Sequence, residues 1–483
     1  MTHSYLIGAV LAYFALVFWL AHRTGRNATN EGFYVGNRSS PWPVVAFGMV
    51  GTTLSGVTFV SVPGAVGRDA FTYFQVILGH VAGFLVIAFV LLPLYYRDRV
   101  TSIYHVLETR LGVGAHRTGA ASFILSRTLG ASARLYLVVN VLQAMLLESA
   151  GVPFAVTALV VIALIVGYTY EGGVKTIVWT DLLQTACMLG GVAVVIWILL
   201  ARLDLGFASS LQMMHERGLS TVFSLDALRA DFIGKQFVAG MFIAIAMAGM
   251  DQEMMQKNIS VRTLADSQKN VLALTLIMLV VVLAFLYLGG LLHLFAAQAS
   301  VSDRGDRLFP AVVMGYLPAA VQLVFLIALV SALFPSADGA LTALTSSFCV
   351  DILGLRERRD LSEAAAARIR KRVHIAFAVL FLVLVLGFDA LGNPSMITVI
   401  LTIAAYTYGP LLGLFTFAIF TRRRPIDRWV PAVAIAAPLA CFALDHYQSA
   451  ILGDYRIGLE ILVLNGVLTF AGLWLISKHS DDR

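Results

Sequence analysis

Apolar runs of membrane-spanning length, separated by short polar segments, occupy most of this chain. The hydrocarbon core of a bilayer takes about 20 consecutive apolar residues of α-helix, and a window of that length predicts thirteen spanning helices. The predicted spans cover residues 4–21, 43–66, 74–96, 118–147, 152–169, 175–201, 233–255, 270–297, 311–349, 373–388, 393–420, 429–446 and 456–477. The pattern therefore predicts an all-α polytopic membrane protein.

Composition supports this class. Hydrophobic residues make up 59% of the 483 residues and charged residues 13%, whereas a water-soluble domain has roughly a quarter of its residues charged. The net charge of +6 does not indicate a nucleic-acid partner, because the basic residues lie in the loops between the apolar runs. Cys187, Cys349 and Cys441 all lie inside apolar runs, which favours packing over a disulfide framework or a metal site.

The positions of Lys and Arg predict the orientation in the membrane. With the N-terminus outside, 24 of the 34 basic residues fall in cytoplasmic segments, eight fall outside, and Arg127 and Arg134 lie within a span. Cytoplasmic loops carry such an excess. Basic residues follow the first run and do not precede it, which favours a retained helix over a cleaved signal peptide. We expect a cell inner-membrane protein with its N-terminus outside and its C-terminus in the cytoplasm.

Two predicted spans carry helix-breaking residues at membrane depth. Residues 48–58 combine three glycines with four hydroxyl residues, and Pro63-Gly64 follows them. Residues 246–252 form a similar interruption five spans later. Irregular backbone at this depth normally lines a cavity, and breaks at matching positions of two halves indicate an inverted-repeat transporter. Close packing of small residues is the alternative, and a third disruption at residues 406–410 is either a gate hinge or an ordinary proline kink.

These breaks predict a core of five plus five inverted helices, with one extra N-terminal helix and two extra C-terminal helices. Residues 1–483 would form a single membrane transport domain. Its parts are an N-terminal helix and loop (1–42), a first five-helix repeat (43–201), an external loop (202–232), a second five-helix repeat (233–420) and C-terminal helices (421–483).

Ionisable residues within spans are costly and commonly functional. Asp181 lies in the sixth span, Asp338 in the ninth, and Arg134 in the fourth. Either these groups pair with one another and fix the helix register, or the carboxylates bind a cation and the arginine binds an anion. A guanidinium suits the second role because it binds a carboxylate through two parallel hydrogen bonds. No Gly-rich phosphate loop and no nucleophile elbow is found, so neither ATP drive nor an enzyme is expected.

Motifs in a fixed order along the chain resemble those of the sodium:solute symporter family. They are Phe33-Tyr34-Val35-Gly36-Asn37-Arg38, Pro41-Trp42, Ser55-Gly56, Pro63-Gly64-Ala65, Trp179-Thr180-Asp181 with Gln184, Gly249-Met250-Asp251-Gln252 with Gln256-Lys257-Asn258, and Tyr408-Gly409-Pro410. The likeness covers roughly residues 4–477. It implies a leucine-transporter-like fold, alternating access, and sodium-coupled import of a small organic solute.

The resemblance also implies a main sodium site. Its ligands would be backbone carbonyls in the broken second span and a carbonyl and a hydroxyl in the ninth, supplied by Gly51, Leu54, Ala332 and Ser336. Many members have two adjacent hydroxyl residues in the ninth span, whereas this chain has Pro335-Ser336. One ligand is therefore lost or replaced.

Asp338 is the expected replacement, or a ligand of a second sodium together with Asp181. A carboxylate is a harder ligand than a hydroxyl, which suits Na⁺. Because burial favours the neutral form of a carboxyl group, Asp338 could instead carry a proton. Proton coupling is therefore an alternative to a second sodium.

In the sialic acid branch of the family, hydroxyls, a glutamine and an arginine surround the carboxylate of the substrate. The resemblance implies that the residues at the matching positions of this chain bind the substrate. They are Thr53, Ser55, Thr58 and Arg134, and Gln75 matches approximately because the loop before it differs. We therefore expect a carboxylate-bearing solute, such as sialic acid or another sugar acid. The expected gating residues are Gly249, Tyr408, Gly409 and Pro410.

Three other functions compete with the symporter. A substrate sensor or a uniporter on the same scaffold would bind the solute without sodium coupling, and a membrane-embedded enzyme would use Asp181 and Asp338 for proton chemistry. The chain lacks an evident signalling domain and a cofactor motif, which disfavours the sensor and the enzyme. The expected partners are the small-molecule solute and the lipid bilayer, with no obligate protein partner.

Overall fold

Nearly all regular structure in the chain is helical, as expected where backbone polar groups must be satisfied within their own segment. The structure is a computed structural model that describes residues 3–26, 29–226, 229, 231–358, 360–391, 396–453 and 457–478. Within these ranges the one sheet pairs two short antiparallel strands, β1 (Arg424–Pro425) and β2 (Ser477–Lys478).

The helices follow the predicted runs closely. Those of the first half are α1 (His3–Gly25), α2 (Asn30–Val35), α3 (Trp42–Leu54), α4 (Gly56–Asp69), α5 (Tyr73–Val86), α6 (Leu92–Arg97), α7 (His105–Arg110), α8 (Val113–Leu142), α9 (Phe154–Thr169), α10 (Val174–Leu203) and α11 (Phe207–Glu216). Those of the second half are α12 (Ile233–Ala244), α13 (Gln252–Ile259), α14 (Leu264–Ala299), α15 (Leu308–Tyr316), α16 (Ala319–Ser347), α17 (Glu363–Leu391), α18 (Met396–Thr407), α19 (Gly409–Phe420), α20 (Val430–His446), α21 (Gln448–Leu452) and α22 (Ile461–Leu475).

In the described part of the chain, seven helices are long and apolar enough to cross a membrane, or nine when two bent pairs each count as one span. The bent pairs are α3 with α4, at 58°, and Ile233–Gly249 with α13, at 65°. These are the two breaks that the sequence predicts, and both are confirmed. The total of thirteen spans stays a prediction.

The predicted run 311–349 differs from the structure, where it is divided between α15 and α16. Pro318 precedes the first residue of α16, and Leu317 has extended backbone angles (φ −97°, ψ 156°). A proline disfavours helical geometry at the residue before it and cannot donate a backbone hydrogen bond. The division therefore follows from Pro318.

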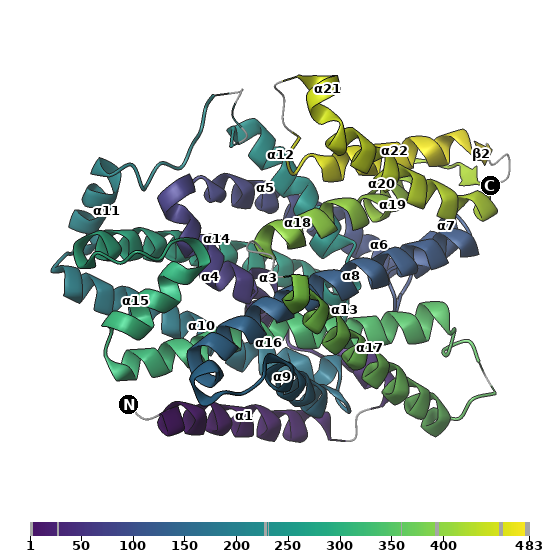
Figure 1. Cartoon of the computed structure of the whole chain (residues 1–483). Helices are drawn as coiled ribbons and strands as arrows, with labels where there is room; N and C mark the ends of the chain where they lie inside the picture. Colours follow the sequence, from purple (N-terminus) through teal and green to yellow (C-terminus); the bar gives the residue numbers. More distant parts are fainter. Residues whose placement is uncertain are drawn as a thin grey trace.

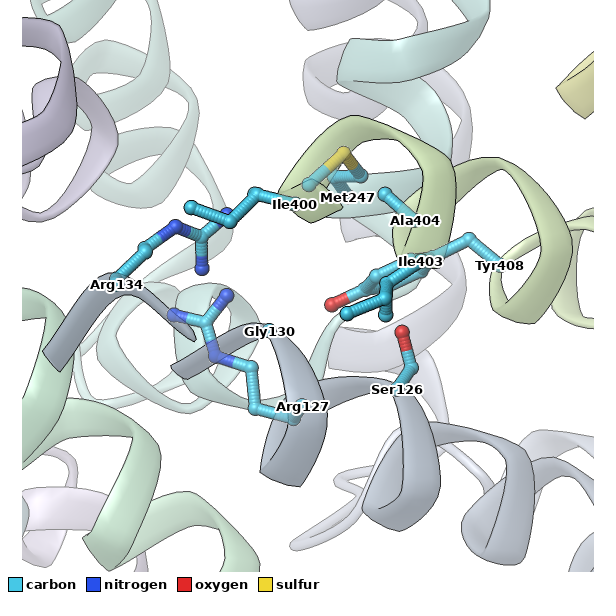
Figure 2. A pocket seen from close by; sticks show the side chains of 9 residues that line it. All are labelled: Ser126, Arg127, Gly130, Arg134, Met247, Ile400, Ile403, Ala404 and Tyr408. Atoms are coloured by element: carbon cyan, nitrogen blue, oxygen red, sulfur yellow. The ribbon is translucent and has the colours of Figure 1, made fainter. Parts of the chain in front are cut away.

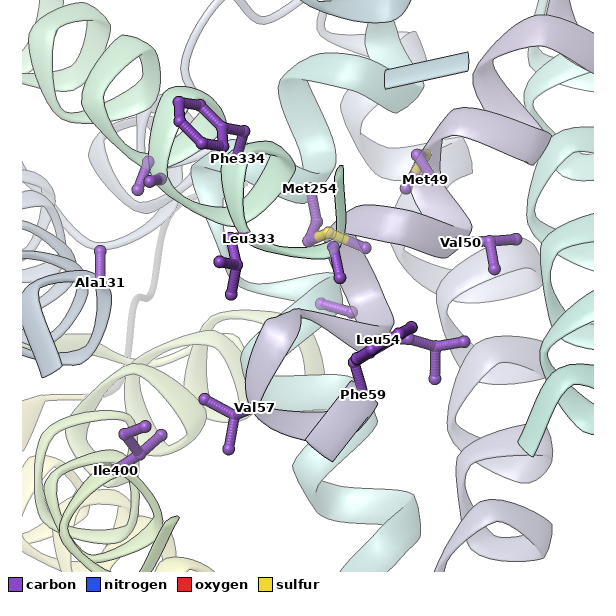
Figure 3. Close-up of a cluster of buried hydrophobic side chains, with 14 of the residues drawn as sticks. Met49, Val50, Leu54, Val57, Phe59, Ala131, Met254, Leu333, Phe334 and Ile400 are labelled. Carbon is purple, nitrogen blue, oxygen red and sulfur yellow. The ribbon is translucent and has the colours of Figure 1, made fainter. Parts of the chain in front are cut away.

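The broken helices lie in the middle of the molecule. In Figure 1, α3, α13 and α16 lie near the centre, while α1 and α22 lie at opposite edges. Buried apolar side chains of the centre come from the break and from the helices beside it, as Figure 3 shows for Leu54 and Val57 around the first break, Leu333 of α16 and Met254 of α13. This core holds the two breaks and α16 against one another.

A polar cluster fastens the C-terminal end of α16 to α7 and α8. His116 lies two residues ahead of the predicted span 118–147, and its ring nitrogens lie 3.0 Å from Asp351 Oδ1 and 2.9 Å from Glu108 Oε2. Asp351, in the turn after α16, also accepts a hydrogen bond from Ser347 at 2.6 Å. His105 contacts the same Glu108 carboxylate at 3.0 Å. One imidazolium between two carboxylates thus joins three helices.

The cluster makes stability depend on pH. Burial lowers the pKa of His116, but the hydrogen bond and charge of Asp351, with the charge of Glu108, more than offset it, so the pKa is raised above 6.5. A raised folded-state pKa gives stability that is fully present below the unfolded pKa and is lost as pH rises through the folded pKa. We expect the melting temperature to fall from about pH 6 to about pH 8 by more in the wild type than in His116→Gln.

The control for this measurement is His22→Gln, since His22 is an exposed imidazole at the end of α1. Its pH profile should match that of the wild type. If His116→Gln also left the pH profile unchanged, the cluster would not be the source of the pH dependence.

Candidate functional site

The first break is a change of backbone direction at Ser55. Leu54 ends α3 and Gly56 begins α4, and between them Ser55 has φ 29° and ψ 164°, outside the helical region. The Ser55 amide still donates to the Gly51 carbonyl, at 3.1 Å. A break of this kind directs the carbonyls at the end of the first half-helix toward the protein interior, where unwound carbonyls can coordinate Na⁺.

Helix α16 faces this break at close range. A Cβ atom added at Gly56 would lie 1.8 Å from Leu333 Cδ2, and one added at Gly51 would lie 3.6 Å from Pro335 Cγ. The structure therefore brings together the two segments that hold the four predicted sodium ligands. The Ser336 hydroxyl donates to the Leu333 carbonyl, at 3.2 Å, which leaves its oxygen lone pairs as acceptors. The donor set consists of carbonyl and hydroxyl oxygens, as Na⁺ requires.

Asp181 has a cationic partner that the sequence did not reveal. Lys257 Nζ lies 2.7 Å from Asp181 Oδ2 and donates to Thr52 Oγ1, also at 2.7 Å. All three side chains are buried. The other Asp181 oxygen, Oδ1, has no hydrogen-bond partner among the described residues. The Lys257 ammonium thus balances the charge of this carboxylate, while the lone pairs of Oδ1 remain available to a further ligand.

Lys257 lies inside the protein, although the count of basic residues for the orientation includes it among the cytoplasmic segments. The Lys257 side chain is 1% exposed, because α13 folds back after the second break and places its polar residues against α3 and α10. One sequence feature could have indicated this burial: Gln256-Lys257-Asn258 comes directly after a break inside a span. A polar segment there can line the interior as well as end a helix.

Asp338 is buried without a cation beside it. Tyr168 donates a hydrogen bond to Oδ2 at 2.7 Å, and the Gly339 amide donates to Oδ1 at 2.5 Å. Asp338 has no ion pair with any residue that the structure describes. An isolated buried carboxylate is very costly. A bound cation or a proton would therefore stabilise Asp338, and these are the two alternatives that the sequence leaves open.

A second ionic group lies at the second break. Asp251 caps α13 by accepting from the Glu253 amide at 2.9 Å. Arg127 of α8 forms an ion pair with Glu253 and lies 3.7 Å from Asp251 Oδ2. The Tyr408 hydroxyl donates to the same Asp251 oxygen at 2.6 Å. The second break is thereby connected to α8 and to the α18–α19 disruption.

The predicted gating residues meet at these connections. The Gly249 carbonyl, at the end of the first half of the broken helix, accepts from Tyr95 at 2.8 Å. Pro410 has no amide proton for the carbonyl of Tyr406 four residues earlier, and the Asn465 side chain of α22 donates to that carbonyl at 2.9 Å. A Cβ atom at Gly409 would lie 2.2 Å from Asn465 Cγ. The disruption is thus satisfied by a side chain, and the choice between hinge and fixed kink stays open.

Arg134 borders a small cavity between α8, the second break and α18 (Figure 2). Its volume of about 10 Å³ is roughly that needed for one water. In Figure 2 the guanidinium groups of Arg127 and Arg134 lie on the same side of this space. The cavity is lined by Ser126, Arg127, Gly130, Arg134, Met247, Ile400, Ile403, Ala404 and Tyr408.

The two arginines differ in their charge balance. Arg127 is neutralised by Glu253, whereas half-buried Arg134 has no hydrogen bond or ion pair with any described residue. A guanidinium without a direct ion pair beside a cavity favours an anion. Among the described residues, Asp181, Asp338 and Arg134 do not pair with one another as the first alternative proposes, since Asp181 pairs with Lys257 and Arg127 pairs with Glu253.

The other predicted substrate residues do not line this cavity. Thr53 donates to the Met49 carbonyl of its own helix at 2.8 Å, Ser55 lies at the break, and Thr58 is half-buried in α4. The Gln75 side chain donates to the Asp231 carbonyl at 3.0 Å and accepts from the amide of residue 224 at 3.2 Å. Gln75 therefore fastens the external loop, and its substrate role stays a prediction.

These features define a class of protein. Helices of membrane length surround two broken spans, and segments that carry carbonyl, hydroxyl and carboxylate oxygens face each other there. A guanidinium without an ion pair to any described residue borders a separate small cavity. Discontinuous helices with ion-binding groups at the centre of the membrane are typical of secondary transporters. The fold and the site thus define a membrane transporter.

The chain belongs to the sodium:solute symporter family, whose family model matches residues 33–425. The sodium/sialic acid symporter SiaT of Proteus mirabilis (strain HI4320) is 21% identical over 419 residues, which cover 82% of this chain and 81% of that protein. The sodium-coupled monocarboxylate transporter 2 of Danio rerio is 27% identical over 416 residues, 83% of this chain and 64% of that protein.

The solved structure of a substrate-bound, outward-open Na⁺-coupled sialic acid symporter superposes with a TM-score of 0.84, at 18% identity, over 98% of this chain and 99% of that chain. The fold is therefore that of this transporter. The family and its members are transporters and not enzymes, and sodium is the coupling ion. The chain is a multi-pass membrane symporter for a small solute.

Proposed function

We propose that the solute carries a carboxylate, such as sialic acid or another sugar acid, and that it enters with sodium by alternating access. The observation that carries the proposal is Arg134, a guanidinium with no ionic partner among the described residues, at the edge of a central cavity. The two relatives support it, because a sialic acid and a monocarboxylate share the carboxylate group. The cavity holds only about 10 Å³, so a solute would require an opened conformation.

We further propose two cation positions. The first uses the carbonyls of Gly51, Leu54 and Ala332 with the Ser336 hydroxyl, because the break and α16 face each other. The second lies between Asp338 and the unpartnered Oδ1 of Asp181. Asp338 is buried and forms no ion pair with any described residue, which supports a sodium ion there. A proton on Asp338 is the alternative.

The proposed membrane arrangement has thirteen spans, a core of five plus five inverted helices, an outside N-terminus and a cytoplasmic C-terminus. The two bent helix pairs support it, since they are the first helices of residues 43–201 and 233–420. The excess of basic residues in the proposed cytoplasmic segments supports the orientation. The burial of Lys257 removes one residue from that set and leaves the excess about threefold.

Thermal stabilisation of the purified protein tests the solute and the ion together. A ligand that binds the folded state raises the melting temperature by mass action. We expect an organic acid to raise it in Na⁺ buffer and not in choline buffer. Arg134→Gln should weaken this binding by about 10- to 100-fold, the equivalent of one charged hydrogen-bonding interaction. Arg422→Gln, an exposed arginine variant, should bind as the wild type does.

The other possible results of this melting-temperature measurement distinguish the alternative functions. Stabilisation by the same acid in Na⁺ and in choline indicates a uniporter or sensor. Stabilisation that is independent of Na⁺ but changes with pH indicates proton coupling. Unchanged acid binding by Arg134→Gln excludes the carboxylate clamp, and a panel of neutral sugars and amino acids then identifies the solute.

A further inference from the structure

A wide groove runs along α8 and α20, away from the sodium ligands. Its volume is about 720 Å³, within the range of small-molecule sites. One wall is a stripe of α8 from Gly114 to Leu125, and the other is a stripe of α20 from Pro431 to Phe442, with lining residues every three or four positions in both. The floor is the α18–α19 disruption, with Thr407 and Pro410.

The groove offers apolar surface and few free polar groups. Leu125, Leu439 and Phe442 are exposed by 56%, 63% and 60%. Three of the four hydroxyls that line it are used inside the protein: Thr118 donates to the Gly114 carbonyl at 2.6 Å, Thr407 to Ser126 at 2.7 Å and Tyr406 to Asp445 at 2.8 Å. A polar solute would find few hydrogen-bond partners in the groove. A hydrocarbon chain forms no hydrogen bonds and therefore loses none when it binds there.

One end of the groove carries a positive charge. Arg117 lines it, is exposed, and has no ion pair or hydrogen bond with any described residue. Among the residues that the structure describes, no acidic residue lines the groove. Asp427, beside the Gly114 end, accepts from the Gly114 and Ala115 amides at 2.8 and 3.1 Å. The free guanidinium favours an anionic group at this end.

The length of the groove matches one leaflet. At 1.5 Å per residue, the stripe from Gly114 to Leu125 spans about 16 Å, about half of a hydrocarbon core of roughly 30 Å. We propose that the groove binds one anionic phospholipid, with its phosphate at Arg117 and an acyl chain along the two stripes. In the proposed orientation this leaflet is the cytoplasmic one. The lipid site itself does not depend on the proposed orientation. The bound chain would contact Thr407 and Pro410, and hence the gating segment.

Native mass spectrometry of the full chain in detergent tests the site, with phosphatidylglycerol and phosphatidylcholine of the same acyl chains as probes. We expect the wild type to retain one phosphatidylglycerol in preference to phosphatidylcholine. Arg117→Gln should reduce this preference by about fivefold, the effect of one basic residue at a membrane surface. Ala121→Trp, which fills the groove between the stripes, should abolish retention of both lipids.

Matched controls keep the outcome specific. Ala436→Trp introduces the same side chain on an exposed position of α20 that does not line the groove, and Arg422→Gln removes a different exposed arginine. Both should retain phosphatidylglycerol. Equal retention of the two lipids by the wild type, or unchanged retention by Ala121→Trp, would overturn the proposal, as would a dimer that Ala121→Trp dissociates. If Ala121→Trp fails to fold, Arg117→Gln decides, since it changes only an exposed side chain.

Discussion

Lys257→Met is expected to lower the free energy of unfolding by about 3–5 kcal/mol, because it leaves the Asp181 carboxylate buried without its cation. Lys257 Nζ lies 2.7 Å from Asp181 Oδ2, and both side chains are 1% exposed. Methionine retains the length and apolar stem of lysine, so the lost charge dominates the effect. The measurement is thermal unfolding of the purified protein in micelles.

Two variants show whether the lost pair is the cause. Asp181→Asn combined with Lys257→Met removes both charges and should recover most of the lost stability, because neutral replacement of a buried pair is far less costly than removal of one partner. Lys269→Met removes a lysine whose pair with Asp266, at 3.2 Å, is exposed, and should change stability by less than about 1 kcal/mol. A double variant as unstable as Lys257→Met would contradict the explanation.

Asp338→Asn is expected to reduce sodium-driven uptake into proteoliposomes by about 100-fold or more. Loss of a buried charge partner corresponds to roughly 3 kcal/mol or more, and each 1.4 kcal/mol is a factor of ten in binding. Asparagine has nearly the same size as aspartate, and its carbonyl can still accept the hydrogen bond from Tyr168. The variant therefore tests the negative charge and not the packing of α16.

The driving gradient separates the two roles of Asp338. If Asp338 binds sodium, the wild type takes up the solute on a Na⁺ gradient alone, and Asp338→Asn does not. If Asp338 carries a proton, a pH gradient drives uptake by the wild type without Na⁺, and the assignment of a sodium ion to Asp338 is wrong. The matched control is Asp445→Asn, which should retain uptake. Asp445 is a half-buried carboxylate of α20 that accepts a hydrogen bond from Tyr406 of α18.

Much of the architecture was predictable, because it depends on local composition. Lipid accepts only apolar side chains and internally bonded backbone, so spanning helices leave long apolar runs that a window detects. The two breaks were equally visible, since glycine, hydroxyl and charged residues interrupt such runs at Ser55 and Asp251. The division at Pro318 could also have been read locally, although the run 311–349 was apolar enough to hide it.

The site was predictable as a set of chemical groups but not as a set of contacts. Asp181, Asp338 and Arg134 stand out because charge is rare at membrane depth. Their partners do not, because Lys257 lies 76 residues from Asp181 and Tyr168 lies 170 from Asp338. Family resemblance predicted which segments bear the sodium ligands, and the structure places these segments face to face.

Local sequence features therefore sufficed to predict the class of fold, the family and the positions of both breaks, because hydrophobic periodicity, helix-breaking residues and ordered motifs are local properties. Three features became visible only after packing: Asp181 pairs with Lys257, Arg127 has an ion pair whereas Arg134 has none with any described residue, and Gln75 bonds to the external loop. These outcomes depend on which buried charges and amides come within about 3 Å after helices distant in the chain have packed, since burial makes each unpaired polar group costly and so selects the pairing.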